Sequence, residues 1–382
     1  MAADSGSPSL LVLLDLIAAF DTVDPTVLLH RLKDTVGLSA DVLQWFRSYL
    51  TDRTEYVLMG GCKSRPLPVT CGVPQGSVLG PILFIIYMLP LGRVISKHGL
   101  SFHCYADDTQ IYIKTAPNST AAPSHLTACL EEIKAWMDSN FLQLDSSKTK
   151  ALLVGTPQQI HSSSISQFTF DSQIIVVSSS VTNLGVQFDP QLNFNNHIKD
   201  LYKTSFHHLR NISKLRPLLS LPDAETLVHA FISSRQDYCN SLFSGIPNKN
   251  IKKLQYIQNS AARILKGVRK YEHITPILKS LHWLPVSSWI DYKLLIITYK
   301  CMNGQAPPYL QELLIPQKHT RTLCSSGSFL LQVPPTRLRT MRDRAFCSAA
   351  PRIWNSLPIN LRTSQTLYSF KALLKTFLFK KA

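Results

Sequence analysis

Two short acidic segments decide how this chain folds: Leu14-Asp15-Leu16-Ile17-Ala18-Ala19-Phe20-Asp21 and Tyr105-Ala106-Asp107-Asp108-Thr109. Each lies in an apolar stretch of strand-like composition. An ionised aspartate there is costly unless it is paired, hydrogen-bonded or bound to a metal. We therefore expect Asp15, Asp107 and Asp108 to converge on one face of a sheet and to bind Mg²⁺, which prefers oxygen ligands. The alternative is a capped turn with solvated aspartates.

The charge of the chain is distributed unevenly. Residues 1–195 contain 12 Lys and Arg against 16 Asp and Glu, whereas residues 196–382 contain 28 against 8. The second half is thus strongly basic, which favours a polyanionic partner and nucleic acid ahead of an anionic membrane. The alternative is a basic surface that serves only solubility.

Cysteines and apolar runs indicate the compartment. The eight cysteines show no CxxC spacing and no cluster with histidine, as expected for reduced thiols in an intracellular protein. The apolar run 10–20 has no basic segment before it and contains Asp15, so we expect a core strand rather than a signal peptide. The run 78–91 is shorter than the ~20 residues of a membrane helix. We predict no membrane span and a nuclear or cytoplasmic location; the sequence does not indicate the oligomeric state.

The pattern of the first half is that of an α+β fold. We expect a strand at 9–14 that is buried on both faces, and helices at 24–36, from 39, from 77 and at 124–140. We expect a hairpin at 102–113 with Asp107 and Asp108 at its tip, where aspartate tolerates a positive φ. Further strands are predicted at 56–59, 67–71, 151–154, 174–177 and 183–188.

From Asn195 onward the pattern is helical. Apolar residues of one stripe, Ile198, Leu201, Tyr202, Phe206, Leu209 and Ile212, alternate with Lys199, Lys203, Arg210 and Lys214. Helices are also predicted at 292–302 and 370–379, with a poorly periodic region at 316–340.

Ordered sequence blocks carry a resemblance to a known family. The blocks are, in order, Leu14 to Asp21, Gly72-Val73-Pro74-Gln75-Gly76-Ser77, Tyr105 to Asp108, and Leu142 to Lys150 with Asn183-Leu184-Gly185-Val186. They resemble successive blocks of the reverse transcriptase region of non-LTR (LINE-type) retrotransposons, of the L2/CR1 and jockey kinds. The similarity continues downstream through Asp237 to Leu242, Leu281 to Val286, Ala306 to Leu310 and Asp343 to Pro358. It covers nearly the whole chain from residue 9.

The resemblance implies a polymerase palm, an antiparallel sheet with packed helices, over residues 1–194. It implies a helical thumb over 195–275 and a basic C-terminal extension over 276–382. The implied activity is RNA-directed DNA synthesis with an RNA template, a DNA primer and deoxynucleoside triphosphates, by two-metal nucleotidyl transfer to a primer 3′ hydroxyl with Mg²⁺, or Mn²⁺ in its place.

The resemblance also implies site residues. Asp15 and Asp107 would bridge the metals, with Asp108 as a further ligand, and Lys148 would assist pyrophosphate departure. Phe20 would crowd the sugar 2′ position, and Gln75, Gly76 and Tyr105 would contact nucleotide or template. Read without the family, Phe20 is a core residue, Lys148 a surface lysine, and Asp21 and Asp24 are turn and capping residues.

Aromatic residues of the basic half have two readings. Tyr202, Tyr256, Trp283 and Trp354 could stack on bases, but buried aromatics are the commoner case. His207, His208 and His282 lack metal-ligand spacing, and we expect ordinary thumb residues there.

The match begins within a few residues of Met1, so the fingers and endonuclease regions of an intact element are not expected in this sequence. The alternative to an active polymerase is therefore a truncated, catalytically inactive remnant that binds nucleic acid. A nuclease or another two-metal phosphotransferase is the third reading, which the Gly72 to Ser77 block opposes.

Overall fold

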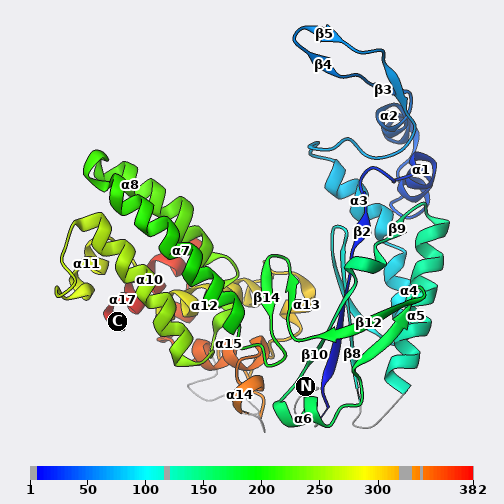
Figure 1. Cartoon of the computed structure of the whole chain (residues 1–382). Coiled ribbons are helices and arrows are strands. Elements are labelled where there is room, and N and C mark those ends of the chain that lie inside the picture. Colours follow the sequence, from blue (N-terminus) through cyan, green and yellow to red (C-terminus); the bar gives the residue numbers. More distant parts are fainter. Residues whose placement is uncertain (1–6, 116–120, 318–328, 336–338, 382) are drawn as a thin grey trace. The chain divides into compact units, whose positions relative to one another are not determined.

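The chain divides into two compact units, with the boundary between Val181 and Thr182. The structure is a computed structural model that describes residues 7–115, 121–317, 329–335 and 339–381. The N-terminal unit is mixed α+β and the C-terminal unit is mainly helical (Figure 1). The expected α+β class is confirmed at this level.

A six-stranded sheet organises the N-terminal unit, in the order β11-β12-β10-β1-β8-β7. All neighbours pair antiparallel except β10 and β12, which are parallel. The strands are β1 (Ser9–Leu14), β7 (Ser101–Tyr105), β8 (Asp108–Lys114), β10 (Lys150–Val154), β11 (Gln167–Phe170) and β12 (Gln173–Ser178). β1 is therefore a central strand.

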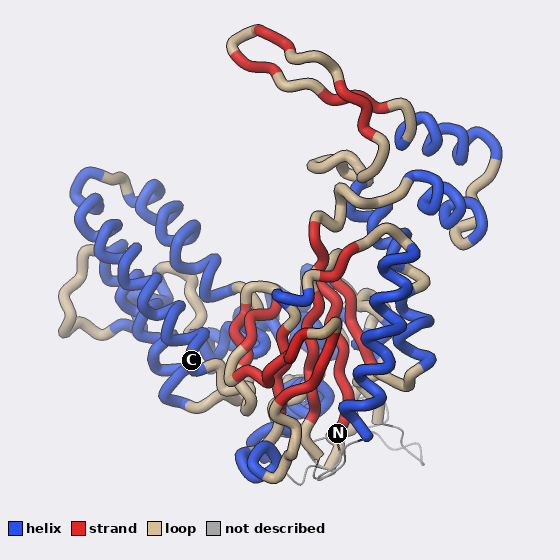
Figure 2. Tube along the Cα trace, turned by 45° about the vertical axis from the view of Figure 1, so that its right-hand side comes forward, coloured by secondary structure: helices blue, strands red, loops and turns tan. Residues whose placement is uncertain are grey.

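Helices pack on one face of this sheet, visible beside the strands in Figure 2. Leu10, Val12 and Leu14 of β1 are buried in one cluster with side chains of α3 (Gly80–Met88) and α5 (Ala121–Ser139). The alternate residues Leu11 and Leu13 are only half-buried. The expectation that β1 is buried on both faces was thus wrong, because helices cover its even-numbered side chains but leave the odd-numbered ones partly open to solvent.

An arm extends from this unit after the first helix pair (Figure 1). α1 (Pro25–Asp34) begins at Asp24, whose carboxylate accepts from the Val27 N–H at 2.8 Å, and α2 (Ala40–Leu50) follows. The arm is one hairpin in two parts: β3 (Arg53–Glu55) pairs with β6 (Leu67–Val69), and β4 (Leu58–Met59) with β5 (Cys62–Lys63). The predicted turn at Gly60-Gly61 is correct, but the predicted strands 56–59 and 67–71 do not pair with each other.

The apolar stretch 80–97 is the one stretch of the described residues with the length and hydropathy of a membrane span. It is not a single straight element, because α3 ends at Met88 and α4 (Leu91–Lys97) begins after Pro90. Leu83, Phe84 and Leu91 are buried in the unit's core. A core helix of a folded domain passes the same composition test, so this stretch is weak evidence for a membrane.

Shorter elements complete the N-terminal unit: β2 (Leu16–Ile17), which pairs with β9 (Gln143–Leu144), the 3₁₀ turn η2 (Ser146–Lys148) and α6 (Pro157–His161). The sequence did not predict β11, because its alternation of buried Phe168 and Phe170 with exposed neighbours covers only four residues. The hairpin tip also differs from the prediction: Ala106, and neither aspartate, has the positive φ of 53°.

The C-terminal unit contains a short hairpin and a set of helices around two apolar clusters. The predicted apolar stripe of α7 (Asn195–Leu215) is largely buried, and its lysines and arginine are exposed. The poorly periodic region 316–340 lies largely outside the described residues. The elements are β13 (Val181–Asn183), β14 (Val186–Phe188), α7 (Asn195–Leu215), η3 (Arg216–Leu218), α8 (Leu221–Val228), the π-helical turn η4 (His229–Ser233), α9 (Ser234–Asp237), η5 (Asn240–Phe243), α10 (Asn248–Lys266), α11 (Ile274–Ser280), α12 (Val286–Met302), α13 (Pro308–Gln311), α14 (Arg339–Arg342), α15 (Phe346–Asn355), α16 (Ile359–Arg362) and α17 (Leu367–Lys381).

Candidate active site

Asp15 lies at the end of the central strand β1. Its side chain accepts a hydrogen bond from the Leu16 N–H at 2.9 Å, and its carbonyl accepts one from the Asp145 N–H at 2.9 Å. The side chain is neither buried nor fully exposed. The strand thus places a carboxylate at its C-terminal end. One oxygen of that carboxylate accepts no backbone hydrogen bond from the described residues.

Asp107 lies in the turn that joins β7 to β8, and Asp108 is the first residue of β8. Leu14 pairs with Thr109 across the β1–β8 ladder, and Tyr105 pairs with Asp108 across β7–β8. The register therefore brings the residue after Leu14 and the residue before Thr109 to the same end of two neighbouring strands. Figure 1 shows β1 and β8 side by side over their length.

The charge state of Asp108 reflects this gathering. Partial burial, the neighbouring Asp107 and then Asp15 together raise the pKa of the Asp108 carboxyl. Both neighbours are negatively charged, so the protonated form of Asp108 is favoured relative to a solvated aspartate. Asp107 and Asp15 are therefore close enough to Asp108 for their carboxylates to disfavour its ionised form.

Lys148 joins the same group. Its Nζ lies 3.2 Å from Oδ2 of Asp15 and 3.2 Å from Oδ2 of Asp145. The hydrogen bond with Asp145 and then that with Asp15 raise the pKa of Lys148. The side chain is 60% exposed, so this bridge adds little to stability but keeps a cation next to Asp15.

Sequence reasoning missed Asp145 as a member of this group. It caps η2, and its pKa is lowered chiefly by the Ser147 hydroxyl, which donates to it at 2.5 Å, and also by Lys148. A capping carboxylate three residues before a lysine was the available signal, because that spacing lets the two side chains meet across one turn.

The Gly72–Ser77 loop is held against the chain that follows Asp15. The Gly72 N–H donates to the Val23 carbonyl at 2.7 Å, and the Val73 N–H donates to that of Phe20 at 2.9 Å. Gln75 Nε2 donates to Oδ1 of Asp21 at 2.9 Å. Asp21 thus positions the loop, a role that the sequence did not reveal, whereas Asp24 caps α1 as predicted.

The predicted nucleotide contacts differ in exposure. Tyr105 is 67% exposed, and Gln75 and Gly76 are exposed as well. Phe20 is half-buried and stacks on Phe84 with ring centroids 4.7 Å apart. Phe20 is therefore packed against the core, as expected from its residue type alone, but is only partly buried.

The donor set suits a hard divalent cation, since it offers carboxylate oxygens alone. Among the described residues, however, no three Asp, Glu, His or Cys side chains are gathered as a ready-made metal site. A bound dication would offset the repulsion of Asp108 by Asp107 and Asp15. The residues therefore suit such an ion, although they do not enclose it.

The aromatic residues singled out in the basic half have unlike environments. Trp354 is 1% exposed and belongs to the core. Trp283 is half-buried, and Tyr256 is 47% exposed and stacks near Tyr202 and Phe206 on the surface of α7 and α10.

Comparison with known proteins places the chain. Residues 1–188 match the family described as reverse transcriptase (RNA-dependent DNA polymerase). The chain is 23% identical over 276 residues to the RNA-directed DNA polymerase from mobile element jockey of Drosophila melanogaster, covering 70% of this chain and 29% of that protein. It is 24% identical over 349 residues to the probable RNA-directed DNA polymerase from transposon X-element of the same fly, covering 88% and 35%.

Solved structures give a weaker likeness. The telomerase of Candida albicans in complex with a TWJ fragment of telomeric RNA aligns at 14% identity and a TM-score of 0.34, covering 75% of this chain and 47% of that chain. Apo telomerase of Candida tropicalis aligns at 11% identity and a TM-score of 0.34, covering 72% and 49%.

The chain spans about a third of the length of the transposon polymerases that it matches. Two comparisons nevertheless agree, the family match over the carboxylate-bearing unit and the similarity to transposon polymerases over most of the chain. Residues 1–188 therefore carry the match to the reverse transcriptase family, and most of the chain is similar to the RNA-directed DNA polymerases of LINE-type, non-LTR retrotransposons.

Proposed function

We propose that this chain acts as an RNA-directed DNA polymerase that extends a primer 3′ hydroxyl. The observation that carries the proposal is the gathering of Asp15, Asp107 and Asp108 at the ends of neighbouring strands. Carboxylates brought together at the cost of mutual repulsion are typical of sites that bind metal and phosphate. The family that residues 1–188 match performs this reaction.

Asp15 and Asp107 are the proposed ligands of two Mg²⁺ ions, with Asp108 as a third carboxylate beside them. Bound there, the ions would lower the pKa of the primer hydroxyl and stabilise the charge on the leaving pyrophosphate. The hydrogen bond from the Leu16 N–H orients the Asp15 side chain and leaves its other oxygen beside Lys148. Mn²⁺ satisfies the same oxygen donors.

Lys148 is the proposed partner of the leaving pyrophosphate. Asp145 and Asp15 hold its ammonium in place before substrate arrives and raise its pKa, so it stays charged. An ammonium oriented in advance stabilises charge that develops in the transition state.

The Gly72–Ser77 loop and its neighbours are the proposed nucleotide and template contacts. Gln75 is anchored by Asp21, which keeps exposed Gly76 next to it in a fixed position. The open part of Phe20 would crowd a sugar 2′ hydroxyl, and exposed Tyr105 would contact the primer or template strand. These roles follow those of the family's matching positions.

RNA template and DNA primer are the proposed partners. In the C-terminal unit a hollow of about 450 Å³ is lined by Lys199, Tyr202, Lys249, Lys252, Lys253 and Tyr256. Lysines around exposed Tyr256 and half-buried Tyr202 provide phosphate contacts and a surface for base stacking. We assign the palm to residues 1–194, the thumb to 195–275 and a basic extension to 276–382 on the family pattern.

The test is Mg²⁺-dependent primer extension on an RNA template. Asp107→Asn is expected to lower the rate by about a hundredfold or more, because it removes a charged oxygen ligand from the reaction centre. Asp34→Asn, on the exposed end of α1, is the matched control and should extend normally. No extension by the unaltered chain, together with salt-dependent binding that Asp107→Asn leaves unchanged, would favour the inactive remnant instead.

A further inference from the structure

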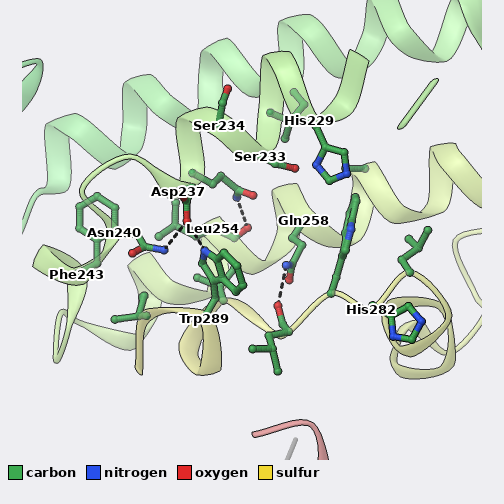
Figure 3. A pocket seen from close by; sticks show the side chains of 18 of the residues that line it. His229, Ser233, Ser234, Asp237, Asn240, Phe243, Leu254, Gln258, His282 and Trp289 are labelled. Carbon is green, nitrogen blue, oxygen red and sulfur yellow. Dashed lines mark hydrogen bonds between the residues drawn. The ribbon is translucent and has the colours of Figure 1, made fainter. Parts of the chain in front are cut away.

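The C-terminal unit contains a cavity of about 490 Å³ that the proposed polymerase chemistry does not use. Its walls come from the π-helical turn η4, α9, α10, the loop 281–284 and the start of α12. Two blocks that stand out in the sequence outside the palm, Asp237 to Leu242 and Leu281 to Val286, both contribute to it. Figure 3 shows His229, Ser233, Gln258 and Trp289 around this space.

The backbone around the cavity is irregular at three points. η4 is a π-helical turn inserted between α8 and α9. Cys239 and His282, neither of them glycine, have left-handed φ values of 53° and 54°, one in each of the two sequence blocks. Such conformations are costly and recur at functional sites, where they shape a pocket.

The wall of the cavity is fixed by hydrogen bonds. Trp289 Nε1 donates to Oδ1 of Asp237 at 2.6 Å, and Lys293 Nζ donates to Oδ2 of the same carboxylate at 2.8 Å. Gln258 Nε2 donates to the Leu284 carbonyl at 2.9 Å. The Asp237 charge is therefore neutralised and the Trp289 indole is held in one orientation, so the cavity is formed before any ligand arrives.

The lining predicts the shape and polarity of a ligand. Trp283, Trp289 and His229 present aromatic rings, and the His229 and Trp283 rings lie edge to face at 5.9 Å. Within the described part of the chain, the His229 ring and the Ser233 hydroxyl make no hydrogen bond. A planar ring with apolar faces and a polar edge satisfies both features, and nucleobases have this character.

The charge at the cavity points to a base that carries a phosphate. Lys375 of α17 also lines the cavity; its ammonium lies 5.9 Å from the centroid of the Phe379 ring and forms no ion pair with a carboxylate of the described residues. The chain from 196 to 382 contains 28 Lys and Arg against 8 Asp and Glu. An ammonium beside an aromatic pocket matches a nucleotide unit and gives no advantage to an apolar peptide side chain.

We propose that this cavity binds one unstacked base of a single-stranded nucleic acid, with the adjoining phosphate at Lys375. The proposal rests on the proposed function only in taking nucleic acid as the partner of this chain. The carboxylates of the candidate active site have no part in it.

The test is photocrosslinking of a single-stranded RNA that contains 5-iodouridine, followed by mapping of the crosslinked peptides by mass spectrometry. Crosslinks to His229, Trp283 or Trp289 are expected. Crosslinks confined to the hollow around Tyr202 and Tyr256, or to the N-terminal unit, would overturn the proposal. The proposal would also be overturned if an excess of an apolar peptide abolished the crosslinks and an excess of unlabelled RNA did not.

Variants add a quantitative arm. Trp283→Ala should weaken binding of the RNA by about tenfold, while Trp283→Phe, which can still stack, should lose much less. With an abasic nucleotide in place of the iodouridine, Trp283→Ala and the unaltered chain should bind equally. Lys375→Gln should reduce the salt slope of binding by about 0.7, and Lys380→Gln, exposed on the same helix, should not.

Two further results separate this inference from the proposed function. Crosslinks in the cavity without any primer extension would leave the inference standing and refute the polymerase activity. Normal primer extension with unchanged binding by Trp283→Ala, once thermal melting shows the variant folded, would refute the inference and leave the polymerase activity intact.

Discussion

At the scale of single residues, the candidate site consists of aspartates that strand pairing places at one end of the sheet. Asp15 and Asp108 come from segments about ninety residues apart in the chain and lie at the same end of the paired strands β1 and β8. Burial and the charges of Asp107 and Asp15 raise the pKa of Asp108. Lys148 relieves part of this repulsion at Asp15. The proposed function therefore requires an arrangement of charges that lowers stability at Asp108.

Asp108→Asn should stabilise the chain at neutral pH in metal-free buffer. A carboxyl whose pKa is raised by folding contributes most stability when protonated and loses that contribution as pH rises through the folded pKa. The neutral amide removes this loss, so we expect a rise in melting temperature of less than about 2 °C at pH 7. The gain should vanish below the ordinary pKa of 3.8.

Thermal melting at pH 7 and at a pH below 3.8, with Asp34→Asn as the exposed control, checks this expectation. An equal gain at both pH values would show that the charge of Asp108 is not the cause. The same variant should lose primer extension, which separates its effect on folding from its effect on catalysis.

At the scale of elements, the Gly72–Ser77 loop depends on close backbone approach. Gly72 has φ 81°, and a Cβ there would lie 3.0 Å from the Cα and carbonyl oxygen of Asp21. Gly76 has φ 73°, but a Cβ there would meet no heavy atom within 4 Å. Both positions favour glycine for its backbone freedom, whereas only Gly72 also requires it for space.

Gly72→Ala should therefore lower the free energy of unfolding by more than Gly76→Ala. We expect about 1 kcal/mol for Gly76→Ala, from left-handed strain alone. Gly72→Ala should cost at least about 2 kcal/mol, since the contact with the Asp21 backbone adds to that strain. Urea denaturation of the two variants measures the difference. Equal losses would mean that the loop moves away from Asp21 freely.

At the scale of the whole molecule, charge and fold change together along the chain. The mixed unit up to Val181 has an excess of acidic residues, and the helical unit that follows has most of the lysine and arginine. A basic helical unit attracts nucleic acid over long range and with little regard to sequence, while the acidic unit contains the carboxylates that we propose as metal ligands.

The Lys249→Gln, Lys252→Gln, Lys253→Gln triple variant should therefore bind single-stranded RNA with a lower salt dependence. Each lost phosphate contact lowers the slope of log K against log salt by about 0.7, so a decrease of about 2 is expected. Filter binding over a salt series measures it. Glutamine at exposed Lys33, Lys63 and Lys114 of the N-terminal unit is the charge-matched control. An equal decrease of the slope in both variants would show that the net charge of the chain, and not the hollow, sets the salt dependence of binding.

The sequence by itself determined most of the elements that carry the candidate site. Apolar periodicity and capping residues such as Asp24 predict α1, β1, β8 and α7, because these signals act over a few neighbouring residues. Aspartates in apolar surroundings, together with the Gly72–Ser77 block, predict the family. Only the tertiary structure decided which side chains meet. The Asp145–Lys148–Asp15 bridge, the hydrogen bond between Gln75 and Asp21, and the cavity at Trp289 depend on strand register and helix packing. Such contacts between distant residues leave no local pattern in a single sequence.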